Sequence, residues 1–286
     1  MKRVLVALAA AAALFGLCPG PAPAATPRVT KVLVVIEENH SLSQMQSQMP
    51  YAYSLAKQYG YASNYTAITH PSLPNYLAIA GGSTFGVTDD NYPSAHKIGS
   101  KSVFSAALNT GRTAKTYNET MPSNCYLSNS GSYAVRHNPW AYFSSTTERS
   151  RCRSYDKPFS AFAGDVSAGS LPNVGMVTPN TCHDAHDCSL ATADSWLKNT
   201  MTKVFNGPDW KAGRLAVVLT ADEDDRSQGN KVLTAVIHPS QSHRVVTTAL
   251  THYSLTGLLC DVAHAPRLGA GATAPSMRTA FALPIG

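Results

Sequence analysis

The sequence lacks the features that would place it within a membrane or on nucleic acid. Beyond residue 17 it has no apolar run of about 20 residues, the length that a membrane-spanning helix requires. It has no heptad pattern and no internal repeat, which argues against coiled-coil and solenoid architectures. Its 23 basic residues are scattered, so no nucleic-acid partner is expected. The formal net charge of +6 is mild and suits small anionic substrates.

The first 24 residues have the pattern of an export signal. They begin with a short basic stretch, continue with an Ala-rich apolar segment at 4–17 and end in an A-x-A cleavage site at 22–24. The apolar segment is too short for a spanning helix. We therefore expect a signal peptide at 1–24 and a single secreted, extracytoplasmic domain at 25–286, without a stable membrane anchor.

Five cysteines follow the signal segment, and export makes disulfides among them the expected state. Cys182 and Cys188 are close in sequence and bracket a cluster of His and Asp residues, so we predict that they pair. Cys125 and Cys152 would then close a second loop within a Ser/Asn-rich insertion at about 120–158. The fifth, in an apolar helical stretch, is predicted to be a buried free thiol: Cys260.

Strands and helices alternate along the remaining chain. Apolar runs at 32–36, 174–177 and 215–220 do not alternate with polar residues, which is typical of strands buried on both faces of a parallel sheet. This alternation predicts an α/β sandwich with a mostly parallel sheet. The other predicted strands are 114–117 and 232–237, and the predicted helices are 51–59, 75–80, 103–109, 189–205 and 252–262.

Polar clusters follow the three buried strands, at 37–40, 183–187 and 222–225. Because parallel strands end at the same edge of a sheet, we expect these clusters to meet there. Carboxylates and imidazoles converging at one edge suit a divalent cation, which would also relieve the repulsion among the acids. Asp224 and Asp225 are expected to be solvated loop charges. Taken alone, the cluster at 37–40 fits a solvating loop equally well.

Ser72 is the candidate nucleophile. It precedes a predicted helix whose first turn contains Pro74, where proline is tolerated. A serine at a helix N-terminus lies in positive potential, beside free N–H groups that can hold a phosphate oxygen. A nearby cation would lower the pKa of the hydroxyl and activate it for attack. The alternative is that Ser72 merely caps the helix, since serine is a common N-cap.

Five motifs together resemble the phosphoesterase family of bacteria and fungi. That family contains secreted acid phosphatases and non-specific phospholipases C, and it is a branch of the alkaline phosphatase superfamily. The resemblance spans roughly residues 29–269, with the motifs in the expected order. They are Glu38-Asn39-His40-Ser41, His70-Pro71-Ser72-Leu73-Pro74-Asn75-Tyr76, Tyr133-x-x-Arg136-His137-Asn138-Pro139, Asp184-x-His186-Asp187-Cys188 and His252-Tyr253-Ser254-Leu255.

The resemblance implies an alkaline phosphatase-like α/β/α sandwich with a mostly parallel central sheet and one divalent metal ion of unspecified identity. It implies that Ser72 is the nucleophile and that its hydroxyl also contacts the metal. The remaining implied metal ligands are Glu38, Asn39, Asp222 and Glu223.

The resemblance also implies roles for residues around the phosphate. Asn75 would donate a hydrogen bond to a phosphate oxygen. The residues that would orient the phosphate or protonate the leaving group are His137, Asp184 and His186.

One motif departs from the family pattern. The family commonly has Asn-Asp-Met-His-Asp-Cys, whereas this chain has an additional histidine, His183, in place of the first Asn. This imidazole would support a second metal near His186, or it is a surface substitution. A further alternative is a metal site made by these two histidines with Cys182 and Cys188, which is less favoured in an exported chain. His70 is expected to be structural.

The sequence therefore predicts a secreted metal-dependent hydrolase of small phosphate monoesters, acting through a phosphoserine. Monoesters are favoured because the chain lacks the additional C-terminal domains usual in the family's phospholipases and has no evident interfacial helix. One alternative is a phospholipase C or phosphodiesterase, and another is a catalytically inactive envelope-binding domain. The metal's identity, the natural substrate and the oligomeric state do not follow from the sequence.

Overall fold

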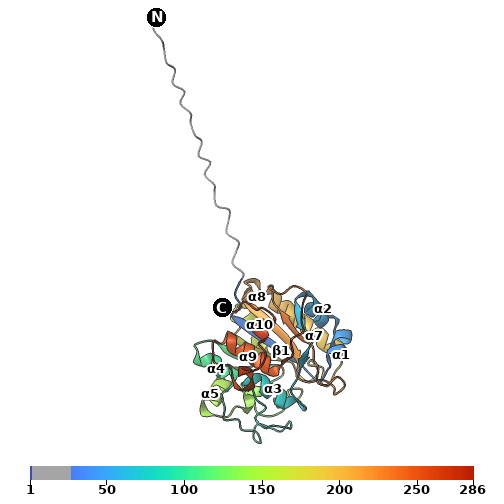
Figure 1. Ribbon diagram of the computed structural model, residues 1–286. Helices are drawn as coiled ribbons and strands as arrows, with labels where there is room; N and C mark the ends of the chain where they lie inside the picture. Colours follow the sequence, from blue (N-terminus) through green and yellow to red (C-terminus); the bar gives the residue numbers. More distant parts are fainter. Residues whose placement is uncertain (2–26) are drawn as a thin grey trace.

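The computed structural model describes Met1 and residues 27–286 (Figure 1). Apart from Met1, the predicted signal peptide at 1–24 lies outside the described residues. Within the described chain, no helix combines the length and the hydropathy needed to cross a bilayer.

An eight-stranded, mostly parallel sheet lies at the centre, in the order β5-β4-β6-β1-β7-β8-β2-β9. The central strand β1 pairs in parallel with β6 on one side and with β7 on the other. β8 alone among the eight is antiparallel to its neighbours. The strands are β1 (Lys31–Glu37), β2 (Gly60–Ala62), β4 (Ala114–Asn118), β5 (Asp156–Pro158), β6 (Val174–Thr178), β7 (Leu215–Ala221), β8 (Thr234–Ile237) and β9 (Arg244–Val246). A separate pair is β3 (Tyr65–Thr66) with β10 (Leu250–Thr251).

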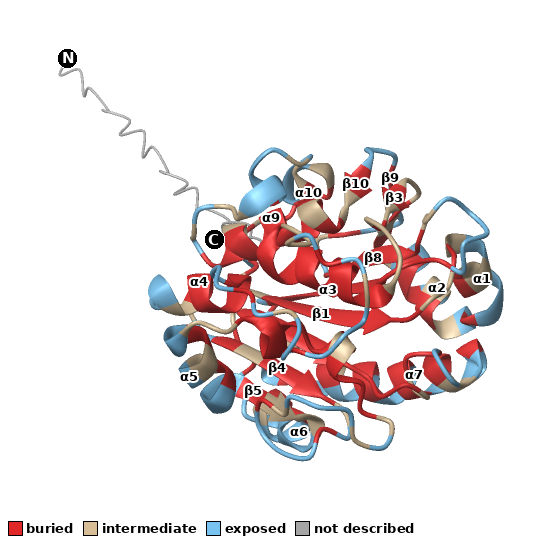
Figure 2. Cartoon of the chain, turned by 90° about the horizontal axis from the view of Figure 1, so that it is seen from below, coloured by how far each residue is buried: buried red, intermediate tan, exposed pale blue. Residues whose placement is uncertain are grey.

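Helices cover both faces of this sheet, which gives the expected α/β/α sandwich. Figure 2 shows α3, α4 and α9 on one side of β1, with α6 and α7 on the other. The first layer consists of α3 (Ser72–Gly81), α4 (Val103–Asn109), α9 (His252–Val262) and α10 (Met277–Ala280). The second consists of α1 (Leu42–Gln48), α2 (Pro50–Gln58), α6 (Phe162–Ser167), α7 (Leu190–Asn206) and α8 (Pro208–Lys211). α5 (Thr146–Tyr155) packs near β5 at the sheet edge.

The apolar strands form the core, as their sequence pattern predicts. Residues 32–36 of β1 are each at most 1% exposed, because the helical layers exclude water from both faces. β7 is likewise buried along its whole length. These strands place their carboxyl ends side by side, where the polar clusters begin.

The predicted disulfides are both present, Cys125–Cys152 and Cys182–Cys188. The alternative of a metal site that uses Cys182 and Cys188 is therefore wrong, because their sulfurs are bonded to each other. Cys260 is a buried free thiol, as expected. The helix predicted at 75–80 begins three residues earlier, at the first residue of α3.

Candidate active site

The ends of β1, β6 and β7 bring the three polar clusters together. The Glu38 amide donates to the Asp184 carbonyl over 2.8 Å, which ties the end of β1 to the loop after β6. The Asp222 amide donates to the Glu37 carbonyl over 3.0 Å, which ties the end of β7 to that of β1. The parallel arrangement of these strands, which the sequence predicts, thus places the three loops in direct contact.

A sharp turn follows β1 at Asn39, beside the carboxylate of Asp222. Asn39 adopts a left-handed backbone with φ of 51°, which asparagine tolerates better than most residues. Its amide and that of Glu223 donate to Asp222 Oδ1, over 3.1 and 2.7 Å. The other oxygens, Asn39 Oδ1 and Asp222 Oδ2, are buried without a hydrogen-bond partner. Buried oxygens without a protein partner are costly, and an ion or a water molecule at this position would satisfy them.

Ser72 is the first residue of α3, and Pro71 occupies the N-cap position. The interpretation of Ser72 as the N-cap is therefore wrong. Its hydroxyl instead donates to Glu38 Oε2 over 3.0 Å. The next amide, of Leu73, donates to Asp90 Oδ1 over 2.9 Å, so a carboxylate already lies at this helix N-terminus.

Asn75 braces the loop before α3. Its Oδ1 accepts from the amides of Ile68 and Thr69, and its Nδ2 donates to the Thr69 carbonyl and to Glu223 Oε2. These bonds occupy the donors of the side chain. The predicted contact of Asn75 with a phosphate oxygen stays a prediction, and it requires the 3.1 Å bond to Glu223 to be released.

His137 lies beneath the cluster between two carboxyls. Its Nε2 is 3.3 Å from Glu38 Oε1, and its Nδ1 is 3.2 Å from Asp184 Oδ2. Burial lowers the pKa of His137 well below its usual value. The imidazole stacks on Tyr76 with ring centroids 5.3 Å apart, and the Tyr76 hydroxyl donates to Glu38 Oε1. The sequence argument gave Tyr76 no role, although it lies one helical turn after Ser72.

His186 occupies the more exposed rim. Its backbone amide donates to Asp184 Oδ1 over 2.8 Å. Arg136 Nη2 lies 3.0 Å from His186 Nε2, and the guanidinium can only donate, so Nε2 accepts. Nδ1 therefore carries the hydrogen and donates to Asp187 Oδ1 over 2.7 Å. Arg136 was also missed as a site residue, although it precedes His137 in its motif.

Four acidic groups in this cluster resist ionisation. Burial raises the pKa of Asp184 and of Asp222 to about 7, and that of Glu223 to about 9. Burial also raises the pKa of Glu38, and the nearby Asp222 and Asp184 raise it further. Among the described residues, no lysine or arginine forms an ion pair with any of these four. Arg136 lowers the pKa of Asp184 and Arg226 lowers that of Glu223, but burial outweighs both effects.

The donors in the cluster fit a divalent cation. Unpartnered oxygens of Asn39 and Asp222 lie beside the Glu38 carboxylate, which also accepts from the Ser72 hydroxyl. Hard oxygen donors of this kind suit Mg²⁺, Ca²⁺ or Mn²⁺. Ligand atoms of Glu38 and of two neighbours, His137 and Asp184, also lie within 4.8 Å of one another. Over residues 27–286, Asp222 and Glu223 do not belong to this closely spaced group, but the oxygen donors of the cluster have the chemistry of a metal centre.

The additional histidine has a partner of its own. His183 Nδ1 lies 2.9 Å from Glu119 Oε2, and the imidazole stacks on the Trp196 indole. Trp196 Nε1 also donates to Glu119, over 3.0 Å. Over residues 27–286, neither His183 nor His186 belongs to a group of three side chains with metal-ligand spacing. A second metal there gains no support from the geometry.

The acidic run after β7 differs in part from expectation. Asp224 is buried and accepts from the amides of Arg226 and Gln228, each over 2.7 Å, so its expected solvation is wrong. Backbone amides take the place of water around this carboxylate, and the spacing of acidic residues in the sequence does not predict that burial. Asp225 is exposed, as expected. His70 lies 3.1 Å from Glu223 and 3.3 Å from Asp224, a bracing position between the two acids.

His252 braces the same strand end from below. Its Nε2–H donates to the Asp222 carbonyl over 2.6 Å, and its Nδ1 accepts from the Tyr65 hydroxyl over 3.0 Å. Burial lowers the pKa of His252 to about 4, so the ring is neutral at ordinary pH. The His-Tyr-Ser-Leu motif at 252–255 thus supports the site from the start of α9.

Comparison with known proteins settles the family. The Phosphoesterase family model matches residues 37–256, which include every cluster described above. This chain belongs to the Phosphoesterase family. The phosphoesterase is 32% identical over 260 residues to a phosphatidylinositol-3-phosphatase of Mycobacterium tuberculosis, covering 90% of this chain and 84% of that one. It is 32% identical over 229 residues to a phosphate-repressible acid phosphatase of Penicillium chrysogenum, covering 75% of this chain and 54% of that one.

Solved structures agree on the fold. A protein of the alkaline phosphatase superfamily from Vibrio parahaemolyticus superposes with a TM-score of 0.59 at 10% identity, covering 90% of this chain and 72% of that one. Murine ectonucleotide pyrophosphatase/phosphodiesterase 5 superposes with a TM-score of 0.52 at 9% identity, covering 83% of this chain and 96% of that one. At such low identity these likenesses establish the alkaline phosphatase-like fold alone. The family establishes that the phosphoesterase is a hydrolase of phosphoric esters.

Proposed function

We propose that this phosphoesterase is an extracytoplasmic, metal-dependent phosphatase that cleaves phosphate monoesters through a phosphoserine. The observation that carries the proposal is the hydrogen bond from Ser72 Oγ to Glu38, at the start of α3 and beside two unpartnered oxygens. The names of the mycobacterial and fungal relatives support phosphatase activity. Two disulfides support a location in an oxidising compartment.

The proposed metal ligands are Glu38, Asn39, Ser72, Asp222 and Glu223. A divalent ion held there would lower the pKa of the serine hydroxyl and offset the negative charge of the phosphoryl group. The chain itself places Ser72 at the start of helix α3, and the buried His252 holds the backbone carbonyl of Asp222. Catalysis in this class of reaction rests mainly on positioning and electrostatics.

In the proposed reaction, Ser72 Oγ attacks phosphorus, and its proton passes to Glu38 Oε2 or to solvent. The new P–O bond forms as the ester oxygen departs with its electron pair. Once Arg136 releases Nε2, His186 takes up a proton from solvent at that nitrogen and passes it to the departing oxygen, while His137 and Asp184 hold the orientation of the site. Water then attacks the phosphoserine, which releases phosphate and restores Ser72.

The test compares Ser72→Ala with Ser105→Ala on 4-nitrophenyl phosphate. Ser105 is a matched control, because it is also a buried helical serine and its hydroxyl has no partner. We expect Ser72→Ala to lower kcat by about 10³-fold or more and the control to retain turnover. Acid quenching of the wild type should trap phosphate on the peptide that contains Ser72. Near-normal turnover of Ser72→Ala would refute the nucleophile.

Two further arms address the metal and the substrate class. Exhaustive chelation should abolish turnover, and readdition of a divalent ion should restore it. Wild-type rates on 4-nitrophenyl phosphate should exceed those on bis(4-nitrophenyl) phosphate and on phosphatidylcholine micelles. The reverse order would favour a phosphodiesterase or phospholipase C, and no turnover on any ester would favour an inactive binding domain.

A further inference from the structure

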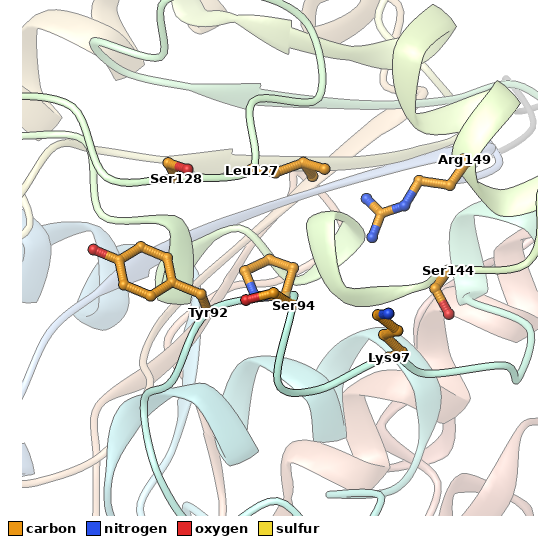
Figure 3. Close-up of a pocket in the computed structure, with 8 residues that line it drawn as sticks. Tyr92, Ser94, Lys97, Leu127, Ser128, Ser144 and Arg149 are labelled. Carbon is orange, nitrogen blue, oxygen red and sulfur yellow. The ribbon is translucent and has the colours of Figure 1, made fainter.

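A cavity of about 680 Å³ lies between the 92–97 loop, the 127–128 loop and the start of α5 (Figure 3). This volume falls in the range of small-molecule sites. Figure 3 shows Lys97 and Arg149 at one end of the cavity and Tyr92 at the other. Tyr92 and Leu127 are 46% and 40% exposed, so both offer apolar surface to a ligand in the cavity. The cavity thus has two cations at one end, and the apolar side chains of Tyr92 and Leu127 lie elsewhere in its lining.

The two cations have no acidic partner among the described residues. Neither Lys97 nor Arg149 forms an ion pair, and Arg149 makes only a 3.9 Å contact with the Cys125 sulfur. Arg153 lies one helical turn further along α5 and adds like charge. Burial and this neighbour lower the pKa of the Arg149 guanidinium. Positive charge has therefore accumulated here without compensation from the protein.

The acidic residues close in sequence to Lys97 and Arg149 bind other partners. Glu148 turns inward and accepts from the Ser102 amide over 2.9 Å and from Trp140 Nε1 over 3.0 Å. Asp89 pairs with His96. The unpaired charge at Lys97 and Arg149 is thus available to an external anion.

Two short segments connect the cavity walls with residues that contact the catalytic cluster. Asp90, which accepts from the amide that follows Ser72, is only two residues from Tyr92. Two extended residues span at most about 7 Å between Cα atoms. On the other wall, the Tyr126 carbonyl beside Leu127 accepts from the Tyr133 hydroxyl over 2.9 Å, four residues before His137.

We propose that this cavity is a second anion subsite, which binds a negatively charged group on the leaving-group portion of a phosphate ester. Lys97 and Arg149 contact the anion, and Tyr92 and Leu127 contact the adjoining apolar portion. The inference rests on the proposed phosphatase function. The shared ligand chemistry is a second phosphate, which comes from a soluble bisphosphate or from the phosphodiester of a phosphoinositide.

The experiment compares paired substrates that differ in the second anion. The first pair is adenosine 3′,5′-bisphosphate and adenosine 3′-monophosphate, followed by release of the 3′-phosphate. The second pair is dioctanoyl phosphatidylinositol 3-phosphate and inositol 3-phosphate. The variant is Lys97→Gln/Arg149→Gln, and the control is Arg153→Gln, which removes the same charge from α5 outside the cavity lining.

We expect the double variant to lower the kcat/KM ratio of at least one pair by about tenfold, mainly through KM, whereas Arg153→Gln keeps the wild-type ratio. A fall confined to the adenosine pair identifies a soluble bisphosphate as the source, and one confined to the inositol pair identifies a lipid headgroup. Unchanged ratios in both pairs, or equal falls in the control, overturn the subsite. Absence of wild-type turnover on every monoester would instead refute the proposed function.

Discussion

Replacement of Tyr76 by phenylalanine tests whether its buried hydrogen bond to Glu38 contributes to stability and to activity. The Tyr76 hydroxyl donates to Glu38 Oε1, and its ring stacks on His137. Tyr76→Phe keeps the ring and the stacking but removes the hydroxyl. Glu38 then retains one side-chain donor, Ser72, for a carboxylate that is fully buried.

The size of the effect follows from the charge on the acceptor, which Glu38 would carry once the proposed cation offsets the cost of its burial. A hydrogen bond to an ionised group contributes about 1.5–3 kcal/mol, and one between neutral groups about 1 kcal/mol. Burial and the neighbouring carboxyls raise the pKa of Tyr76 well above its usual value, so the hydroxyl stays protonated and keeps donating. We expect Tyr76→Phe to lower the free energy of unfolding by about 2 kcal/mol. Loss of a residue that orients a metal ligand typically costs about 10–100-fold in activity or metal affinity.

Tyr142→Phe is the matched control. Tyr142 is equally buried, and its hydroxyl donates over 3.0 Å to a neutral acceptor, the Asn91 carbonyl. Urea unfolding should show about 1 kcal/mol lost in this control, with turnover of 4-nitrophenyl phosphate retained. If both variants lost the same stability and the same activity, the argument that Tyr76 acts through Glu38 would be refuted.

Two further predictions concern stability. Burial raises the pKa of Asp156 to about 6, so its carboxyl favours folding while protonated and opposes it as pH rises through 6. Relative to Asp156→Asn, the wild type should lose roughly 2 kcal/mol of unfolding free energy between pH 4 and pH 7, measured by urea titration at each pH. Separately, Cys182→Ser/Cys188→Ser should cost about 2 kcal/mol by releasing a short loop. It should also lower kcat, because that loop carries Asp184 and His186.

Each of these predictions has a clear contrary result. A stability difference between wild type and Asp156→Asn that is constant across the pH range would show that this carboxyl has the same pKa in the folded and unfolded chains. Full turnover in the double cysteine variant, at a temperature where it remains folded, would show that the disulfide does not position the loop.

The sequence by itself determined the framework. Apolar runs without alternation at 32–36, 174–177 and 215–220 leave little choice but strands covered on both faces, because no solvated face could accommodate them. Short-range signals also located Ser72 at the start of a helix and paired Cys182 with Cys188. These features depend on local conformation and on the common direction of parallel strands, so they can be read from spacing.

Only the tertiary structure decided how the polar side chains are used. Asp224 resembles its exposed neighbour Asp225 in sequence, yet it is buried because the following loop turns its amides onto the carboxylate. Likewise, the partner of His183 is Glu119, more than sixty residues away. The pairing of Tyr76 with Glu38 and the unpaired charge at the cavity also arise between distant segments. A side chain's desolvation and partners depend on which segments pack around it, and local sequence patterns do not encode that packing.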